Sequence, residues 1–292
     1  MCRGTPRRMK ITIFKGGKLL KIIYFSKYDK DLSVEKLGGK VKTMGFDGID
    51  LTVRPGHPVN PGNVTEALPK AQKVWNSQGI EATFVTTHLG FLDPTDPTAK
   101  KLYAACSEAG IKWIKLAYWE YRKGQDYWEG VERIRKALEG FERLSKEHGV
   151  KTCCHTHSGA LYGSNCASLM HLIKGFNPEY IGAYIDTGHL ILDGEEYTMG
   201  LAMVKDYLSL VALKDAIYTK GEEDGELVDK PKFVPLGKGL VPWKKFFTLL
   251  SDTGYDGPLS IHGEYEVEKK IRDKWVKEDL EFIRGVLRTV QK

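Results

Sequence analysis

Eight short apolar runs alternate with eight helix-like segments along the chain, and this alternation constrains the fold more than any other feature. The apolar runs are KIIYFS, GIDLTV, ATFVTTH, IKWIKLAY, VKTCCH, YIGAYID, LSLVALKD and PLSIHGEY. The helix-like segments are Leu32–Met44, Val64–Gln78, Thr98–Ala109, Tyr127–His148, Cys166–Lys174, Met199–Tyr207, Pro242–Ser251 and Glu268–Val290. Many of the runs are apolar at successive positions, as strands buried on both faces of a parallel sheet require. The pattern therefore predicts repeated βα units.

Eight βα units in 292 residues favour a closed (β/α)8 TIM barrel over a doubly wound sheet. A doubly wound sheet more often has fewer units and a glycine-rich first turn, and no G-x-G-x-x-G motif follows any of the runs. We expect one domain over residues 1–292, because no low-complexity linker interrupts the alternation. The segment KITIFKGGKLL, Lys10–Leu20, is compatible with either a β-hairpin below the barrel or a ragged extension. The polar stretch 221–233 predicts a mobile loop on the catalytic side.

Composition narrows the class of protein. No apolar run approaches the roughly 18–20 residues that a membrane span needs, and no hydrophobic segment follows the arginines of MCRGTPRRMK, so we expect a cytoplasmic protein. The odd number of cysteines, five, favours a reducing compartment over a disulfide scaffold. The 44 basic residues are dispersed among 38 acidic ones, and nucleic-acid binding normally needs a concentrated basic stripe. We therefore expect no nucleic-acid and no membrane partner.

Ionisable side chains gather at the ends of the predicted strands. Six of the eight histidines fall there: His57, His88, His155, His157, His189 and His262. The same ends carry further polar side chains: Asp50, Arg54, Asp186, Lys214, Asp215 and Glu264. Active sites of TIM barrels lie at the carboxyl ends of the strands. Burying several ionisable groups at one point is costly without a ligand, so their convergence predicts a functional site.

Each residue also has a structural explanation. A lone histidine at a strand end is more often a hydrogen-bonded structural residue than a ligand or base. Asp186 could cap the turn that follows it. Lys214 and Asp215 point to opposite faces of their strand, so we expect one of them to face the helix layer in a structural ion pair. Arg54 and His57 lie in a loop rich in proline and glycine, where either could brace a turn.

Three of these side chains are candidate ligands of one metal ion. His155, Asp186 and His262 lie on separate strands and offer two imidazoles and a carboxylate, which suit a divalent ion such as manganese, zinc, iron or cobalt. Such an ion could polarise a carbonyl while a neighbouring base removes a proton from carbon. The acid–base candidates are Glu264, Lys214, His157 and His189, which spacing alone does not rank. The substrate-binding candidates are Arg54, His57, His88 and Trp119.

Six motifs carry a resemblance to a known family. GFDGIDLTVRPG, THSG, IDTGH, LKDA, VPLGKGLVPW and GYDGPLSIHGEY occur in this order over nearly the whole chain. They resemble the xylose isomerase-like TIM barrel superfamily of sugar phosphate isomerases and epimerases, which also holds endonuclease IV. The resemblance implies carbohydrate chemistry: relatives isomerise or epimerise keto sugars, dehydrate inososes and cleave keto-glycosides. All of these reactions begin at an acidic C–H beside a carbonyl.

The resemblance also implies a metal site with a glutamate, an aspartate, a histidine and a glutamate on strands five to eight. Asp186 and His189 match the D-x-x-H pattern of strand six. His155, Ala212 and His262 depart from the pattern, because they stand where glutamate, histidine and glutamate are expected. Paired glutamates are therefore not available for two-base proton transfer, and Glu264 is the residue that could replace one of them.

These features together predict a metal-dependent isomerase or epimerase acting on a keto sugar or related polyol. The alternative is a metal-dependent lyase or dehydratase acting on keto-sugars or keto-glycosides. An abasic-site endonuclease fits less well, because DAIYTKGEEDGELVD lacks the D-x-H pair after strand seven. A non-catalytic sugar-binding protein would explain Ala212 and the missing glutamates. PLGKGL could hold a phosphate or simply turn the chain, and the rim aromatics Tyr118, Trp119 and Trp128 suit a sugar or a homo-oligomer interface.

Overall fold

Eight parallel strands close into a barrel in the computed structural model, which describes residues 20–290. The strands are β1 (Ile22–Phe25), β2 (Gly48–Val53), β3 (Ala82–Thr87), β4 (Trp113–Lys115), β5 (Lys151–His155), β6 (Ile181–Asp186), β7 (Leu208–Leu213) and β10 (Leu259–Ile261). Their order around the barrel is β1-β10-β7-β6-β5-β4-β3-β2. The predicted (β/α)8 barrel is confirmed. Apart from Leu20, the hairpin predicted for Lys10–Leu20 lies outside the described residues.

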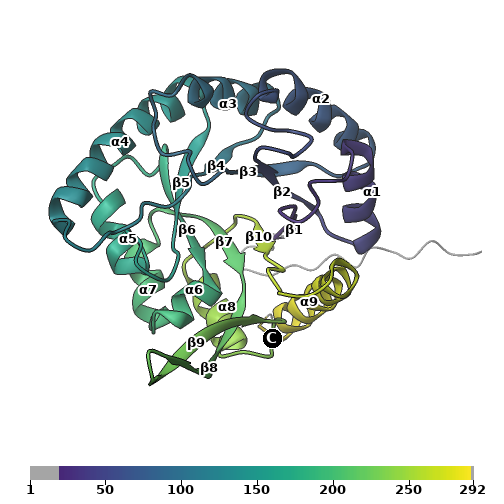
Figure 1. Cartoon of the computed structure of the whole chain (residues 1–292). Coiled ribbons are helices and arrows are strands. Elements are labelled where there is room, and N and C mark those ends of the chain that lie inside the picture. The colour runs from purple at the N-terminus through teal and green to yellow at the C-terminus, as the bar shows by residue number, and fades with distance from the viewer. Residues whose placement is uncertain (1–19, 291–292) are drawn as a thin grey trace, which may run out of the picture.

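Helices surround the barrel, as Figure 1 shows. They are α1 (Val34–Met44), α2 (Val64–Ser77), α3 (Pro97–Glu108), α4 (Tyr127–His148), α5 (Cys166–Ile173), α6 (Thr187–Leu192), α7 (Tyr197–Val204), α8 (Trp243–Asp252) and α9 (Lys269–Val290). Polar caps fix several of their ends. Asp126 caps α4 by accepting from the backbone of Glu129, and Gly149 ends the helix in the left-handed conformation. Among the described residues, every helix is too short or too polar to cross a membrane.

The inside of the barrel holds a small apolar cluster, separate from the larger core between the sheet and the helices. Its members are Ile23, Phe84, Cys153, Tyr184, Leu210 and Ala212. Alternate residues of a strand face the same side. This alternation brings His155, Asp186 and Lys214 to the mouth of the barrel, each two residues beyond a member of the cluster. The fold therefore gathers ionisable side chains above an apolar plug.

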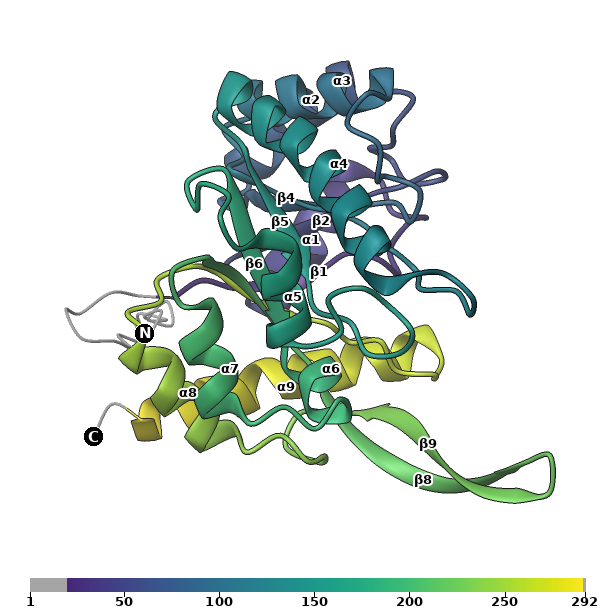
Figure 2. The same cartoon turned by 90° about the vertical axis from the view of Figure 1, so that its left-hand side faces the viewer.

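A β-hairpin follows β7, where the sequence predicts a mobile polar loop. It consists of β8 (Asp215–Glu223) and β9 (Glu226–Val234), paired antiparallel over their full length. Asp224 and Gly225 form its tight turn with positive φ angles of 50° and 80°, a conformation that an Asp-Gly pair adopts readily. Figure 2 shows the hairpin projecting away from the barrel. The stretch thus has regular secondary structure instead of an irregular course.

Candidate active site

A cavity of about 450 Å³ opens at the carboxyl ends of the barrel strands. It is lined by Phe25, Lys27, Arg54, Thr86, Leu89, Lys115, Tyr118, Glu120, His157, Leu161, His262 and Glu264. Its volume lies within the range of roughly 300–1,000 Å³ that small-molecule sites occupy. The position matches the place where TIM barrels bind their substrates.

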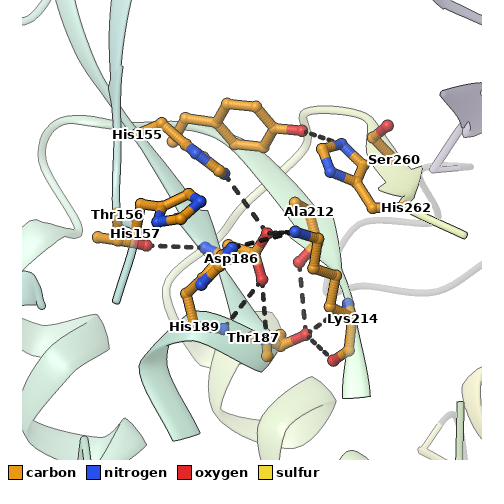
Figure 3. Close-up of polar contacts among 12 residues, drawn as sticks. His155, Thr156, His157, Asp186, Thr187, His189, Ala212, Lys214, Ser260 and His262 are labelled. Atoms are coloured by element: carbon orange, nitrogen blue, oxygen red, sulfur yellow. Dashed lines mark hydrogen bonds and ion pairs between the residues drawn. The ribbon is translucent and has the colours of Figure 1, made fainter. Parts of the chain in front are cut away.

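The structure brings most of the predicted site residues to this end of the barrel. Four of them line it directly: Arg54, His157, His262 and Glu264. Four more lie buried at or just beyond the strand ends: His155, Asp186, Lys214 and, in α6, His189. Figure 3 shows these buried side chains converging. They come from β5, β6, α6 and the residue that follows β7. The convergence predicted from the strand ends is therefore present.

Three of the predicted substrate-binding residues do not line the cavity. His57 lines a separate small hollow beside Ser26 and Asp29. His88 lines an apolar hollow and packs edge-on against Phe91, with 5.9 Å between ring centroids. Trp119 packs, partly buried, against the main core. Among the four residues of this set, only Arg54 reaches the cavity wall, and its Nε donates to the carbonyl oxygen of Thr87 at 3.1 Å.

Lys214 forms the electrostatic centre of the buried group. Its side chain is almost completely buried, and its Nζ lies 3.6 Å from Asp186 Oδ2 and 3.0 Å from His189 Nε2. The same ammonium group forms an ion pair with Glu264, which is also paired with Lys27. A cation that shares two carboxylates and one imidazole nitrogen is held firmly in its charged form.

The charge states follow from these contacts. Burial alone would lower the pKa of Lys214, but the negative charges of Glu264 and Asp186 raise it above the usual lysine value. Burial opposes ionisation of Glu264, yet Lys214 and Lys27 hold the pKa of its carboxyl well below the usual range. Against its own burial, the pKa of Asp186 is lowered, chiefly by Lys214. At the centre of this buried group, the positive charge of Lys214 is therefore balanced by the negative charges of Asp186 and Glu264.

The three predicted metal ligands do not converge on one point. His155 Nε2 lies 3.6 Å from Asp186 Oδ2, and neither atom has a hydrogen-bond partner among the described residues. His262 faces elsewhere, because its Nε2 lies 3.1 Å from Asp50 Oδ2 and 2.9 Å from the hydroxyl of Tyr184. The ring centroids of the two histidines are 6.3 Å apart.

The donor set does not fit a divalent metal ion. Within residues 20–290, no group of three or more histidine, cysteine, aspartate or glutamate side chains is arranged to hold one. An ion placed against Asp186 Oδ2 would lie close to the Lys214 ammonium group and would be repelled by it. Lys214 supplies the positive charge at this point instead.

Two stacked imidazoles close the other side of the centre. The rings of His157 and His189 lie 3.7 Å apart, and Ser158 Oγ lies 2.9 Å from His189 Nδ1. His157 Nδ1 faces the carbonyl oxygen of Ser158 at 3.0 Å. Because a carbonyl only accepts, Nδ1 carries the hydrogen and Nε2 keeps its lone pair. Burial and the Lys214 charge lower the pKa of His157 to about 4, so its ring is neutral at pH 7.

Comparison with known proteins places the chain in a family. The family model described as "Xylose isomerase-like TIM barrel" matches residues 39–286. The chain belongs to this family. The resemblance carried by the sequence motifs is thereby confirmed.

Curated proteins resemble the chain in sequence over about half of its length. An inosose dehydratase of Lacticaseibacillus casei is 24% identical over 151 residues, covering 49% of this chain and 49% of the relative. Inosose dehydratase 2 of Bacillus cereus is 28% identical over 148 residues, covering 47% and 48%. The chain thus matches about half the length of these curated relatives.

Solved structures of epimerases share the barrel. A 3-keto-D-glucoside 4-epimerase from E. coli has a TM-score of 0.70 at 13% identity, covering 91% of this chain and 99% of that one. A D-psicose 3-epimerase from Clostridium cellulolyticum H10, solved with D-tagatose, has a TM-score of 0.68 at 16% identity, covering 92% and 99%. At these identities the likeness establishes the fold.

Sequence reasoning missed the role of Lys115 in this xylose isomerase-like barrel. Lys115 is the last residue of β4, its side chain lines the cavity, and only 2% of the residue is exposed. The signal was available, because Lys115 follows Trp113 by two residues and Trp113 packs against the inner cluster. Burial, assisted by the charge of Arg54, lowers the pKa of Lys115 to about 7.

Asp50, one of the polar residues at the predicted strand ends, has a role that the sequence did not specify. Its fully buried carboxylate accepts from Thr86 Oγ1 at 2.6 Å and Ser260 Oγ at 2.9 Å, and it faces His262 Nε2. This network fixes the ring of His262, which also stacks on Phe25 with 4.0 Å between centroids. His262 is therefore held as part of the cavity wall.

Asp215 faces away from the mouth, as the alternation with Lys214 predicts, but in the described part of the chain it is held by N–H donors and not by the expected ion pair. Its carboxylate accepts from the amides of Gly237, Gly239 and Val241 and from Trp243 Nε1, at 2.9–3.1 Å. Within PLGKGL, the amides of Gly237 and Gly239 are thus bound to this internal carboxylate, and the amide of Leu236 donates to Asp279. The loop is a structural turn anchored from β8.

Proposed function

We propose that the chain is an isomerase or epimerase that acts on a keto sugar or related polyol by removing a proton from the carbon beside a carbonyl. The observation that supports this most directly is the cavity with an acid–base group on two sides. Glu264 follows β10 and His157 follows β5, and strands β7 and β6 separate them around the barrel. Either group could take the proton from a bound sugar, and its return to the opposite face requires that the second group has taken a proton from solvent.

Both groups are in the proton-accepting form at neutral pH. Glu264 is a carboxylate because Lys214 and Lys27 stabilise its negative charge. His157 is a neutral imidazole whose Nε2 carries the lone pair. His189 stacks beneath His157 and Lys214 lies beneath Glu264, so these two buried residues position the bases and set their charge.

The remaining lining suits a polyhydroxylated ligand. Lys27 and Arg54 place cationic donors on the wall, where they can bind hydroxyl or carbonyl oxygens. Phe25 and Tyr118 add aromatic surface for the apolar face of a sugar ring. A few polar groups on a partly apolar wall are the usual composition of a small-molecule site.

A dehydratase or lyase acting on keto-sugars or keto-glycosides is the second candidate, and the similarity to two inosose dehydratases favours it. Elimination begins with the same step, because loss of the proton beside a carbonyl creates the electron pair that expels a hydroxyl one carbon further on. The two candidate reactions therefore share the removal of this proton. They differ in the next step, because only the elimination expels a hydroxyl group. Metal dependence, which the sequence favoured, has no fitting donor set among the described residues and is not part of this proposal.

Solvent exchange tests the shared step. We expect the protein in D2O to introduce deuterium beside the carbonyl of a sugar from a panel of D-fructose, D-tagatose, D-psicose and an inosose. Nuclear magnetic resonance would locate the deuterium, and mass spectrometry would distinguish an isomerised product from one that has lost water. Binding of these sugars without exchange of any of them would contradict the proposal.

Glu264→Gln sharpens the same test. Loss of the carboxylate should lower the exchange rate by roughly 10²–10⁴-fold, the usual contribution of a positioned acid or base. Glu266→Gln is the matched control, because Glu266 lies two residues away and is exposed. Equal rates in the two variants would remove Glu264 from the proposed mechanism.

A further inference from the structure

Lys115 is a buried amine that faces the cavity without an acidic partner. Its strand, β4, lies diametrically opposite β10 in the closed barrel. The Nζ atom lies 3.9 Å from the centroid of the Tyr118 ring. In the part of the chain that the structure describes, no hydrogen bond and no ion pair reaches this nitrogen. A lysine in such a place is unusual, since buried ammonium groups are normally paired.

The charges around Lys115 do not compensate for its burial. They come from β2, through Asp50 and Arg54, from Lys214 after β7 and from Glu264 after β10. The imidazoles of His155 and His157 on the β5 side are held uncharged by their own burial. Burial and Arg54 together lower the pKa of Lys115 to about 7, so near neutral pH much of the side chain is free amine. A free amine is a nucleophile, whereas an ammonium group is not.

Proton removal by the two bases of the cavity requires a group that stabilises the electron pair left on carbon, and Lys115 can supply this stabilisation. His157 and Glu264 line the cavity as an imidazole and a carboxylate, which are weak bases toward a C–H bond. Weak bases remove a proton from carbon only when the electron pair left behind is strongly stabilised. Among the described residues, the metal ligands that would provide such stabilisation do not come together.

We propose that Lys115 is a catalytic nucleophile that forms a Schiff base with the carbonyl carbon of a keto sugar bound in the cavity. This proposal rests on the proposed function and specifies how the carbonyl is activated. The cavity wall presents the amine, and Glu264 comes from the opposite strand. The substrate carbonyl would lie between the nucleophile and the base.

The reaction balances without an oxidant, a reductant or a metal. The Lys115 nitrogen forms a bond to the carbonyl carbon while the carbonyl π electrons move to oxygen. That oxygen takes one proton from the nitrogen and a second from the site, and leaves as water. The resulting iminium accepts the electron pair of the neighbouring C–H bond when Glu264 or His157 takes the proton. Return of the proton to carbon and addition of water restore the ketone and the amine.

Reductive trapping tests the proposal on the unmodified protein. The protein is incubated at pH 7 with D-fructose or D-tagatose and sodium cyanoborohydride, and its peptides are mapped by mass spectrometry. We expect Lys115 to gain the mass of the sugar less one water plus two hydrogen atoms. Lys112, which is exposed and lies just before the same strand, is the internal control for ordinary glycation. At pH 7 an amine with a pKa of about 7 is about half unprotonated, against roughly one part in 2,500 at the ordinary lysine value, so labelling of Lys115 should exceed that of Lys112 by roughly a thousandfold.

Variants give an independent readout. Lys115→Arg keeps a cation but has no amine that can form an imine, so it should lose the label and its deuterium exchange should fall to the background of free sugar. Lys112→Arg should keep both. Exchange at the unmodified rate in Lys115→Arg would overturn the proposal, as would trapping that is absent or no stronger at Lys115 than at Lys112.

The two measurements separate the two proposals. Deuterium exchange without label on Lys115 would reject the Schiff base and leave the isomerase or epimerase function standing. Label on Lys115 without exchange of any sugar would support the nucleophile and reject that function. Absence of both would reject both.

Discussion

Two buried lysines at the mouth of the barrel differ in charge, although they are buried to almost the same degree. Lys115 and Lys214 are 2% and 3% exposed. Lys214 lies among two carboxylates, and its pKa is raised. Lys115 lies over an aromatic ring, and its pKa falls to about 7. The contrast teaches that the partners of a buried amine, and not its burial alone, decide whether it is charged.

The difference in charge between the two lysines gives the two sides of the site different roles. On the β7 and β10 side, Lys214 holds a fixed charge that keeps Glu264 ionised. On the β4 side, Lys115 holds a proton that it can lose near neutral pH. The first lysine contributes to the stability and charge of the site, and the second contributes reactivity.

The largest expected effect is on folding. Lys214→Met should lower the free energy of unfolding by roughly 3–5 kcal/mol, because Asp186 would remain buried without its cation and Glu264 would keep only Lys27. Lys115→Met should leave the free energy of unfolding unchanged or raise it, since it replaces an unpaired buried amine by an apolar side chain of similar shape. Urea unfolding followed by circular dichroism measures both. If the two variants lose equal stability, the contrast between the lysines is wrong.

A smaller effect should appear in the pH dependence of stability. The pKa of Lys115 is about 7 in the folded protein, against an ordinary value of 10.5. Between these values the unfolded chain binds a proton that the folded protein does not, so the free energy of unfolding rises with pH. The slope from this group is at most about 1.4 kcal/mol per pH unit and vanishes below pH 7. Unfolding of the unmodified protein and of Lys115→Met at pH 7 and pH 9 isolates it, and an unchanged difference between them would contradict the assignment.

The smallest effect should follow removal of metal ions. Because the Lys214 ammonium group occupies the charged position beside Asp186, dialysis against EDTA should change neither the Tm nor the rate of deuterium exchange. Differential scanning calorimetry and the exchange assay check this outcome. A fall in Tm that manganese or zinc reverses would show that a metal ion shares the centre with Lys214.

The barrel could be predicted from the sequence because its signals are local. The predicted bounds of α4, Tyr127–His148, match the structure, since an aspartate cap and a glycine enclose a long amphipathic stretch. The helix α6 was missed, because six residues are too few to show a helical period. The hairpin of β8 and β9 was missed because its strands are polar, although Asp224 and Gly225 are a recognised turn signal.

The site could be predicted only as a set of residues. Strand ends reveal that His155, Asp186 and His262 approach the same mouth. They do not reveal which way a ring turns. The orientation of His262 depends on Asp50, which lies 212 residues earlier in the chain, and on the hydroxyl of Tyr184. Such pairings arise only when the barrel closes. The prediction of a metal site from His155, Asp186 and His262 therefore missed both the orientation of His262 and the contacts of Lys214.

Lys214 and Asp215 are neighbours in the chain but belong to opposite sides of the barrel wall. The first sets the charge in the mouth, and the second fastens the turn that precedes α8 through the amides of Gly237, Gly239 and Val241. One peptide bond therefore links the residue that sets the charge in the mouth to the residue that holds the turn before α8. Any displacement of that outer turn would therefore be felt at the ammonium group inside, which couples the position of a surface segment to the ionisation of Glu264.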